Sequence, residues 1–447
     1  GVRLPVTTVS QRERGQGEAP PAADAGRPLD VVVVTTMFPT PAETFASARV
    51  RSLLEAGHRV RVASFKAPAD GWERLVAERG LERAELLPNS PSAAVSGLAA
   101  AVSRPALLGR ALAWLARTCA GQPSHLTRAL AALPFAFRLL ALLERDAPDV
   151  VHLEWGHYPA VVVPLVRWRG LPCAVSLSLV AYDIYRGFPG TRTAAHLADV
   201  VRTQAQGNVA DIVTVTGLPP ESIELVADGV DVARIRELAA TTARVPGRVA
   251  VAARLVPEKG VDDALRAFAH ARRACPHATL HVLGTGPAEA SLRRLAAELG
   301  VADAVAFLGH VPHDQVLSEL AAAEALLHLS HMERLPNAVK EAMACGCVVV
   351  TTRTVGIEEL VRDGQTGYLV DVRDHAAAGA ALEMALTRPQ EHARMRAAAA
   401  ALVAETMDHA ASVRKLVGLW RRALAARGQG QAKAAGRGSH DAVTGST

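Results

Sequence analysis

Aromatic side chains are scarce in this sequence, at 4% of 447 residues, although half of all residues are apolar. The cores must therefore be built mainly from Ala, Val and Leu. The five cysteines are odd in number and scattered, which excludes a disulfide framework and favours a reducing cytoplasm. Cys345 and Cys347 form a C-x-C, but no further ligands lie at a suitable spacing. We interpret them as small buried residues rather than as metal ligands.

Long apolar runs and a strong net charge are also missing. No stretch approaches the ~18 consecutive apolar residues of a membrane span, because the longest candidate, 129–143, is interrupted by Pro134 and Arg138. Residues 1–28 lack the apolar segment of a signal peptide. The formal net charge of +5 is small for this length. It mildly favours an anionic ligand or membrane surface and does not require a nucleic acid.

Two successive series of strands and helices occupy most of the chain, and the length alone also predicts two domains. The continuous β-branched run 30–36 is typical of a strand buried on both faces of a parallel sheet. In the region 198–216 the pattern is ambiguous, because both 200–203 and 212–215 could be a strand. The other expected strands are 59–65, 149–153, 172–179, 222–226, 248–253, 279–283, 305–308, 325–329, 348–352 and 368–370.

The pattern predicts an α/β fold with two facing Rossmann-like domains. Open sheets bind ligands in the crevice at the carboxyl ends of their strands, so we expect the ligand in the cleft between the two domains. Residues 96–145 are helical in pattern, with breaks expected near Pro105, 121–123 and Pro134. The expected organisation is a disordered tail at 1–28, a first domain at 29–232, a linker at 233–246, a second domain at 247–405, a C-terminal helix at 406–426 that packs back towards the first domain, and a disordered tail at 427–447.

Cationic and glycine residues follow the strands of the second series. Arg254 and Lys259 come after strand 248–253, where two cations suit a diphosphate; the alternative is a solvated charged turn. The segment Gly284-Thr285-Gly286 is an incomplete G-x-G-x-x-G, since residue 289 is Glu, and is more typical of a tight turn. Gly356 lies at a further strand-to-helix junction and adds a source of backbone amides.

The stretch HMERLPNAVKEAMACGC, residues 331–347, places two carboxylates seven residues apart. Pro336 suits the first position of a helix over 336–344. Helical spacing turns Val339, Ala342 and Met343 inward and places Asn337, Lys340, Glu341 and Ala344 on the opposite side. A helix N-terminus favours anions, and a carboxylate one turn further in can accept hydrogen bonds from two vicinal hydroxyls, as in a ribose. The alternative is a surface helix with solvated charges.

In order and spacing, these motifs resemble the GT-B fold glycosyltransferases of the retaining family-4 type, the glycosyl transferases group 1. Arg254 and Lys259 match the family's cationic pair, Glu333 and Glu341 its E-x7-E motif, and 342–349 the segment that follows. The first domain resembles the family more loosely, at 38–45, 149–156 and 227–231.

The resemblance implies a nucleotide-diphosphate sugar as co-substrate, with no cofactor and no metal. Arg254 and Lys259 would neutralise the leaving diphosphate, Glu333 would contact the donor sugar, and Glu341 would hold the ribose. Further residues expected at the donor nucleotide are Gly309, His310, Val311, Leu335, Pro336, Asn337 and Gly356. The acceptor-side candidates are Glu43, Thr44, His157 and Asp183, although an ordinary loop histidine is the favoured interpretation of His157.

The implied function is sugar transfer to a hydroxyl of a polysaccharide, a lipid-linked intermediate or a natural product. The expected location is the cytoplasm, with peripheral contact to the inner face of the membrane through arginines of the segment 96–145; the favoured alternative is that these arginines are solvated. They are Arg104, Arg110, Arg117, Arg128 and Arg138.

Two positions depart from the family pattern. Val180 stands where a histidine near the donor sugar is usual, and valine cannot exchange a proton. This favours the main rival hypothesis, a catalytically weak or inactive GT-B relative that binds a nucleotide or a partner protein. A nucleotide-sugar epimerase is a weaker rival, because the first domain offers few carboxylates and histidines. Arg334 replaces a common glycine and could pair with Glu333 or reach an acidic donor.

Overall fold

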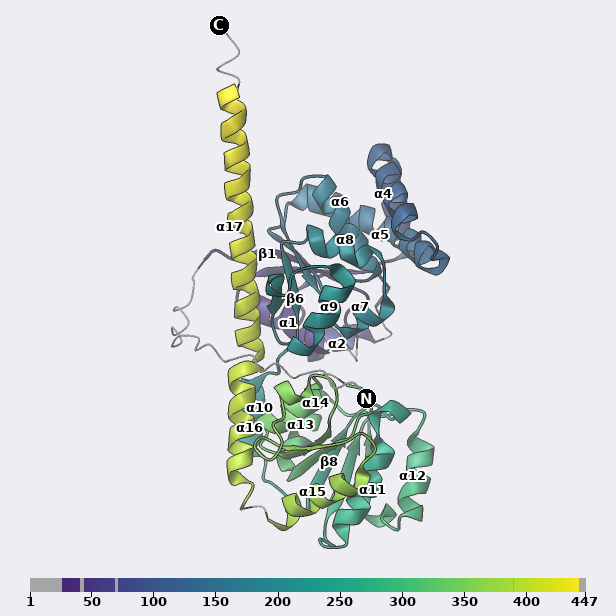
Figure 1. Ribbon diagram of the computed structural model, residues 1–447, viewed down its shortest axis with the longest axis vertical. Coiled ribbons are helices and arrows are strands. Elements are labelled where there is room, and N and C mark those ends of the chain that lie inside the picture. Colours follow the sequence, from purple (N-terminus) through teal and green to yellow (C-terminus); the bar gives the residue numbers. More distant parts are fainter. Residues whose placement is uncertain (1–25, 41–43, 69–70, 334, 389, 442–447) are drawn as a thin grey trace, which may run out of the picture.

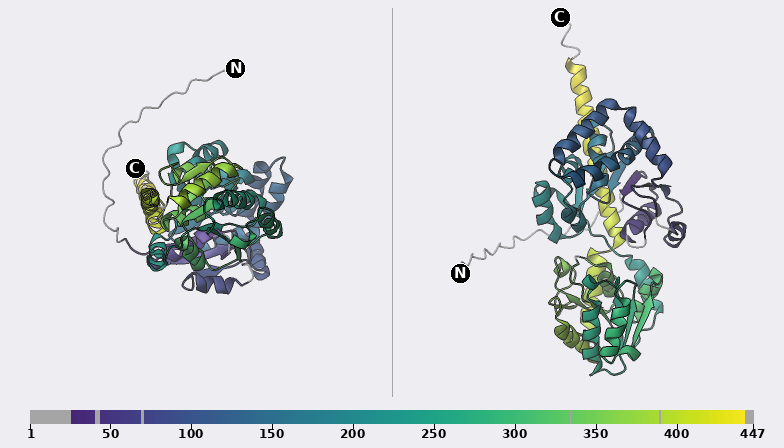
Figure 2. Two further views of the ribbon diagram at one scale, coloured as in Figure 1. Left: turned by 90° about the horizontal axis from the view of Figure 1, so that it is seen from below. Right: turned by 90° about the vertical axis from the view of Figure 1, so that its right-hand side faces the viewer.

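The computed structural model describes residues 26–40, 44–68, 71–333, 335–388 and 390–441. Two α/β domains lie one above the other, and the last two helices run along one side, Ala393–Thr406 beside the second domain and His409–Asp441 beside the first (Figures 1 and 2). Each domain is built around its own parallel sheet with helices packed on it, which confirms the predicted fold class.

The first domain contains a seven-stranded sheet in the order β3-β2-β1-β4-β5-β6-β7. Its strands are β1 Asp30–Thr35, β2 Arg59–Ser64, β3 Glu85–Leu87, β4 Val150–Leu153, β5 Ala174–Ser178, β6 Val200–Thr203 and β7 Ile223–Leu225. Its helices are α1 Thr44–Glu55, α2 Trp72–Glu78, α3 Pro91–Val102, α4 Pro105–Thr118, α5 Pro123–Asp146, α6 Val162–Trp168, α7 Ala181–Arg186, α8 Gly190–Leu197 and α9 Val209–Thr216. The ambiguity at 198–216 is thus resolved in favour of a strand at 200–203.

The second domain contains a six-stranded sheet in the order β10-β9-β8-β11-β12-β13. Its strands are β8 Arg248–Ala252, β9 Thr279–Leu283, β10 Val305–Gly309, β11 Ala325–His328, β12 Val348–Thr352 and β13 Tyr368–Val370. The remaining helices are α10 Val232–Thr241, α11 Val261–Arg272, α12 Glu289–Glu298, α13 His313–Ala322, α14 Asn337–Ala344, α15 His375–Thr387, α16 Ala393–Thr406 and α17 His409–Asp441. Short 3-10 helices include η2 Gln206–Asn208, η4 Pro257–Lys259 and η6 Ile357–Glu359.

Each sheet reverses its strand order once, between β1 and β4 in the first domain and between β8 and β11 in the second. All strand pairs are parallel, so the loops at the carboxyl ends of neighbouring strands gather at one edge of each sheet. Ligands of open α/β sheets bind at such reversal points. In the second domain these loops carry Arg254 after β8 and Glu333 after β11.

The prediction that Pro134 breaks the helical segment 96–145 is wrong. Pro134 lies inside the continuous helix α5. Helix α3 crosses it closely, since a Cβ on Gly97 would lie 2.0 Å from the Pro134 carbonyl oxygen. Within the described part of the chain, α5 is also the one helix long and apolar enough to cross a membrane, although Pro134 and Arg138 interrupt its apolar run. Half of its apolar window is buried in the protein, as in a core helix of a folded domain.

The expected linker at 233–246 contains α10, which packs on α13 and α14 of the second domain. The chain crosses between the domains next to it, where Val230 pairs with Asp408 and receives a hydrogen bond at its carbonyl from the His409 amide at 3.0 Å. A Cβ on Gly229 would lie 2.4 Å from the Met407 carbonyl oxygen, so the two crossing segments touch.

The predicted tail at 427–447 begins too early, because α17 continues to Asp441. Arg427 anchors this part of the helix through a 3.0 Å ion pair with Asp199 of the first domain. Further back, Leu416 and Trp420 are fully buried in the apolar cluster that contains Val31 and Val33 of β1. The last helix of the chain is therefore part of the first domain's core.

Candidate functional site

A cavity of about 820 Å³ lies between the two domains. The second domain contributes residues that follow its strands, and the first domain contributes one side of α1 and the end of α2. Predicted site residues along the wall are Arg254, His310, Val311, Asn337 and Glu341. The structure thus brings together residues from the loops after β8 and β10 and from helix α14 of the second domain.

Lys259 and Glu333 form an ion pair with each other, and neither is among the residues that line the cavity. Both side chains are mostly buried, with 17% and 24% of their surface exposed. Lys259 ends the short helix η4, and Glu333 follows β11, so the pair joins the loops after two neighbouring strands. Arg254 lies in the same loop as Lys259 but is exposed towards the cavity. The site therefore offers one cation held by a carboxylate and one that faces the open cavity.

Gly284 and Gly286 are required by close backbone approach. A Cβ on Gly284 would lie 1.9 Å from the Ala253 carbonyl oxygen, and one on Gly286 would lie 2.3 Å from the Leu255 carbonyl oxygen. Gly284 also has a φ of +135°, which side-chain-bearing residues rarely adopt. The glycines hold the loop after β9 against the loop that carries Arg254.

We expect Gly284→Ala to lower the free energy of unfolding by about 1–3 kcal/mol, because the new methyl group forces the backbone into a strained conformation. Urea denaturation measures this change. Gly109→Ala is the matched control: an added Cβ meets nothing within 4 Å in the middle of α4. Alanine there is expected to be neutral or to stabilise the protein by up to about 1 kcal/mol. Equal stability of Gly284→Ala and the wild type would contradict the assignment.

Helix α14 begins at Asn337, with Pro336 as its N-cap. Val339, Ala342 and Met343 are fully buried, as predicted. The side chain of Glu341 is 11% exposed, lines the cavity, and its Oε1 lies 2.9 Å from Nε2 of His313. His313 is the first residue of α13 and was missed by sequence reasoning, because no motif marks it. Its partner lies 28 residues further along the chain.

The alternative interpretation of α14 as a surface helix with solvated charges does not hold for Lys340. Lys340 is 1% exposed and donates hydrogen bonds to the Asp228 carbonyl and, at 3.0 Å, to Asn337 Oδ1. Burial lowers its pKa to about 8. A lysine turned inward is satisfied here because the segment that crosses between the domains runs over α14. This contact ties the site helix to the crossing segment.

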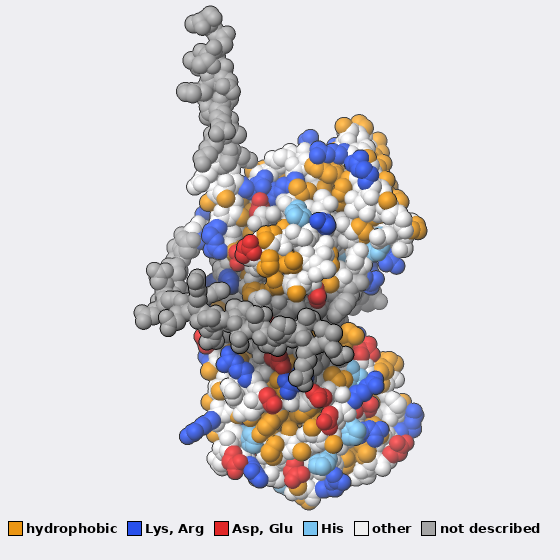
Figure 3. All heavy atoms as spheres, in the orientation of Figure 1, with side chains coloured by type: hydrophobic (Ala, Val, Ile, Leu, Met, Phe, Trp, Pro, Cys, Tyr) orange, Lys and Arg blue, Asp and Glu red, His pale blue; other side chains and the backbone are white. Residues whose placement is uncertain are grey.

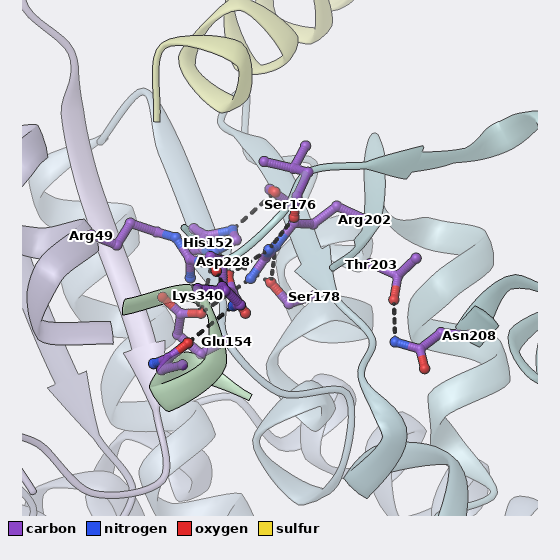
Figure 4. A network of polar contacts seen from close by, with 12 residues as sticks. Arg49, His152, Glu154, Ser176, Ser178, Arg202, Thr203, Asn208, Asp228 and Lys340 are labelled. Carbon is purple, nitrogen blue, oxygen red and sulfur yellow. Dashed lines mark hydrogen bonds and ion pairs between the residues drawn. The ribbon is translucent and has the colours of Figure 1, made fainter. Parts of the chain in front are cut away.

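A buried polar network continues from Asp228 into the first domain (Figure 4). The Asp228 carboxylate pairs with Arg49 of α1 and, at 2.8 Å, with Arg202 of β6. Arg49 also pairs with Glu154. All four side chains are at most 6% exposed. Despite their burial, the charges of Arg202 and Arg49 hold the pKa of Asp228 below its usual range.

A second polar contact joins the domains near Gly356. Glu359 of η6 accepts hydrogen bonds of 2.9 Å from the backbone amides of both Gln206 and Gly207 in the first domain. Gly356 caps η6 with a φ of +84°, and its Cα would lie 3.6 Å from a Cβ on Gly207. Gly356 therefore lies where the second domain touches the first. Gly356 does not line the cavity, and neither do Gly309, Leu335 and Pro336.

The acceptor-side candidates His157 and Asp183 form a pair in the first domain. Asp183 Oδ1 lies 2.9 Å from His157 Nδ1, and His157 Nε2 lies 3.2 Å from Thr36 Oγ1. Burial raises the pKa of Asp183, although its bonds to His157 oppose this. Both side chains are buried, and neither lines the cavity. Val180 caps α7 directly in front of Asp183.

Some predicted residues have other surroundings or are not described. Leu335 packs in the apolar cluster beneath α14. Glu43 and Arg334 lie outside the described residues, as does the side chain of Thr44. The hypothesis that Arg334 pairs with Glu333 therefore stays a prediction.

Asp262, Asp263 and His331 place three potential metal-ligand atoms within 4.8 Å of one another. His331 Nε2 lies 2.8 Å from Asp263 Oδ2. Both aspartates lie in the first turn of α11, where negative charge stabilises a helix. The pair with His331 fixes the loop that leads to Glu333. Helix capping charge and the pair with His331 are therefore sufficient reasons for this cluster. The expectation that the reaction needs no metal stays a prediction.

Comparison with known proteins assigns the family. The profile described as "Glycosyl transferases group 1" matches residues 245–402. A D-inositol 3-phosphate glycosyltransferase from Acidothermus cellulolyticus is 32% identical over 336 residues, which are 68% of this chain and 73% of that protein. The chain belongs to the glycosyl transferases group 1 family. A GDP-mannose-dependent phosphatidylinositol monomannoside mannosyltransferase from Mycolicibacterium smegmatis is another relative, 33% identical over 264 residues that cover 53% of this chain and 66% of that protein.

Solved structures confirm that this group 1 glycosyltransferase has the GT-B fold. The HepE protein of Anabaena in complex with UDP superposes with a TM-score of 0.64 at 18% identity, covering 87% of this chain and 99% of that one. Sucrose-phosphate synthase from Thermosynechococcus elongatus has a TM-score of 0.61 at 18% identity, covering 89% of this chain and all of that one.

Proposed function

We propose that this group 1 glycosyltransferase moves a sugar from a nucleotide-diphosphate sugar to an acceptor hydroxyl, with retention of the anomeric configuration and without a metal ion. The observation that carries the proposal is the arrangement of Arg254, Lys259, Glu333 and Glu341. They come from two loops and one helix of the second domain: Arg254 and Glu341 line the cavity between the domains, and Lys259 and Glu333 pair with each other in the loops after β8 and β11. Cations and a hydroxyl-binding carboxylate are the groups that a nucleotide-diphosphate sugar requires.

In the proposed reaction, the acceptor oxygen bonds to the anomeric carbon while the bond from that carbon to the diphosphate oxygen breaks. The acceptor's proton passes to the leaving diphosphate. Negative charge grows on the diphosphate, where Arg254 and Lys259 stabilise it. Lys259 is paired with Glu333, so a diphosphate bound to this lysine would bring the donor sugar close to the Glu333 carboxylate.

The proposed acceptor is a polysaccharide, a lipid-linked intermediate or a small molecule, held on the first domain's side of the cleft. The names of the two curated relatives, which refer to inositol phosphate and a phosphatidylinositol mannoside, support a polyol or lipid-linked acceptor. Helix α3 exposes Val95, Leu98 and Val102 by 54–71%. In Figure 3 hydrophobic side chains lie beside arginines or lysines at the upper right of the first domain, where Figure 1 labels α4. Exposed apolar side chains beside cations support the proposal that the enzyme makes peripheral contact with the inner face of a membrane.

A donor panel tests the proposal. Among UDP-, GDP- and dTDP-sugars, we expect one base to raise the free energy of unfolding by about 2.7 kcal/mol at a concentration of 100 Kd, because binding to the folded state stabilises it. Thermal shift detects binding, and proton NMR of the product reports the anomeric configuration. Turnover should survive EDTA. A panel in which no donor binds and none is consumed would refute the proposal.

Val180 supports one alternative, a nucleotide-binding relative with weak or no turnover. Val180 is the N-cap of α7, three residues before Asp183, and its side chain cannot donate or accept a proton. Donor binding without turnover, in the presence of polyol and lipid-linked acceptors, would favour this alternative. Turnover that is lost in Asp183→Asn but kept in an exposed control, Asp303→Asn, would favour the active enzyme and assign a role to the His157–Asp183 pair.

A further inference from the structure

His313 contacts the carboxylate that the proposed function assigns to the ribose. Pro312 caps α13, so His313 starts that helix at the rim of the cavity. Its side chain is 54% exposed, whereas that of Glu341 is 11% exposed. The 2.9 Å contact joins Nε2 to Oε1. No described residue hydrogen-bonds Oε2 of Glu341, which leaves that oxygen for a ligand.

The two helices that carry this contact are fixed against each other. Leu317 and Leu320 of α13 pack with Val339 and Met343 of α14 in one buried cluster. The imidazole and the carboxylate therefore meet without a large movement of either backbone. An unsupported glutamate has several rotamers, and holding one of its oxygens removes part of this freedom before the ligand arrives.

We propose that His313 is a positioning residue for the donor, which holds one oxygen of Glu341 so that the other accepts hydrogen bonds from the vicinal hydroxyls of the ribose. This inference rests on the proposed function, because it requires a ribonucleotide in the cavity. It adds a specificity element that the E-x7-E motif does not contain. His313 acts through Glu341 and takes no part in bond breaking.

Charged groups on every neighbouring element act on His313. Burial lowers its pKa, but the hydrogen bond and charge of Glu341 and the charge of Asp314 outweigh this, so that the pKa lies above its ordinary value. Arg79 of the first domain opposes the shift, and Arg234 of α10 pairs with Asp314 at 2.7 Å. Protonated His313 guarantees a donor to Glu341, whereas one tautomer of neutral His313 provides none at Nε2.

The sign of the pH dependence follows from the raised pKa. Below that pKa, His313 is charged and ribose recognition is strongest. Recognition weakens as the pH rises through the pKa, because the charge on His313 is lost.

The test compares a ribonucleoside diphosphate with its 2′-deoxy analogue, using the base found in the donor panel. Calorimetry gives the ratio of the two Kd values at pH 6 and pH 8.5. The terminal phosphate ionises alike in both ligands, so its effect cancels in the ratio. We expect His313→Ala to reduce the preference for ribose about tenfold at pH 6 and less at pH 8.5, as for the loss of one hydrogen bond to a charged group. The wild type should lose preference with rising pH.

His313→Gln keeps an N–H donor without a charge, so it should restore most of the preference and remove the pH dependence. His281→Ala is the matched control, since it removes another histidine–glutamate contact of 2.8 Å, between His281 of β9 and Glu319 of α13. It should leave the ratio unchanged. If His313→Ala leaves the Kd ratio unchanged at both pH values while Glu341→Ala loses the preference for ribose, the role of His313 is overturned and the proposed function stands. Absence of nucleotide binding by the wild type would overturn the proposed function.

Discussion

Lys259→Ala is expected to lower turnover about 100- to 1000-fold, the usual effect of removing one preorganised group from developing negative charge. Lys259 is paired with Glu333, which fixes the position of its ammonium group. The remaining Arg254 is exposed and cannot replace a mostly buried cation. The effect should fall mainly on kcat, since the charge on the leaving diphosphate is greatest in the transition state.

Steady-state kinetics with the donor from the panel measure this effect. Lys415→Ala is the control, because Lys415 is an exposed lysine on α17. Lys259→Arg keeps a cation and should retain part of the activity. The unfolding free energy of Lys259→Ala should fall by no more than about 1 kcal/mol, because Glu333 remains partly solvated. A kcat within threefold of the wild type would show that Lys259 does not act on the leaving group.

Asp228→Ala is expected to lower the free energy of unfolding by about 3–5 kcal/mol, since breaking a buried ion pair leaves an uncompensated charge. Its carboxylate joins Arg49 and Arg202, both at most 3% exposed. Glu154 pairs with Arg49 but lies 3.8 Å from Arg202, so Arg202 loses its principal partner. Asp303→Ala is the matched control: Asp303 pairs with Arg272 at 2.8 Å but is 71% exposed, and its loss should change stability by no more than about 1 kcal/mol.

Urea denaturation at pH 7, followed by tryptophan fluorescence, measures the change. The pKa of Asp228 is lowered in the folded state, so the carboxylate stabilises the protein above its unfolded pKa of about 3.9. This contribution is lost as the pH falls through the folded-state pKa. The difference between the wild type and Asp228→Ala should therefore shrink in acid. A difference below about 1 kcal/mol at pH 7 would mean that solvent reaches the network.

Local sequence patterns were sufficient to predict the parallel sheets and the buried face of helix α14. β-branched runs specify strands buried on both faces, and helical periodicity turned Val339 and Met343 inward. Periodicity could not predict the burial of Lys340, because one of its two hydrogen-bond partners, the Asp228 carbonyl, lies 112 residues away in the chain. His313 was missed for the same reason: the contact with Glu341 exists only after α13 and α14 have packed.

Helix α17 has a consequence for synthesis on the ribosome. Leu416 and Trp420 complete the apolar cluster around β1, although they are made almost 400 residues after it. The second domain has its own cluster and can close as soon as its strands and helices have emerged. The first domain to be translated is thus the last to be finished, and until α17 arrives it displays an open apolar face on which a chaperone can act. A chain truncated after residue 405 would keep that face permanently.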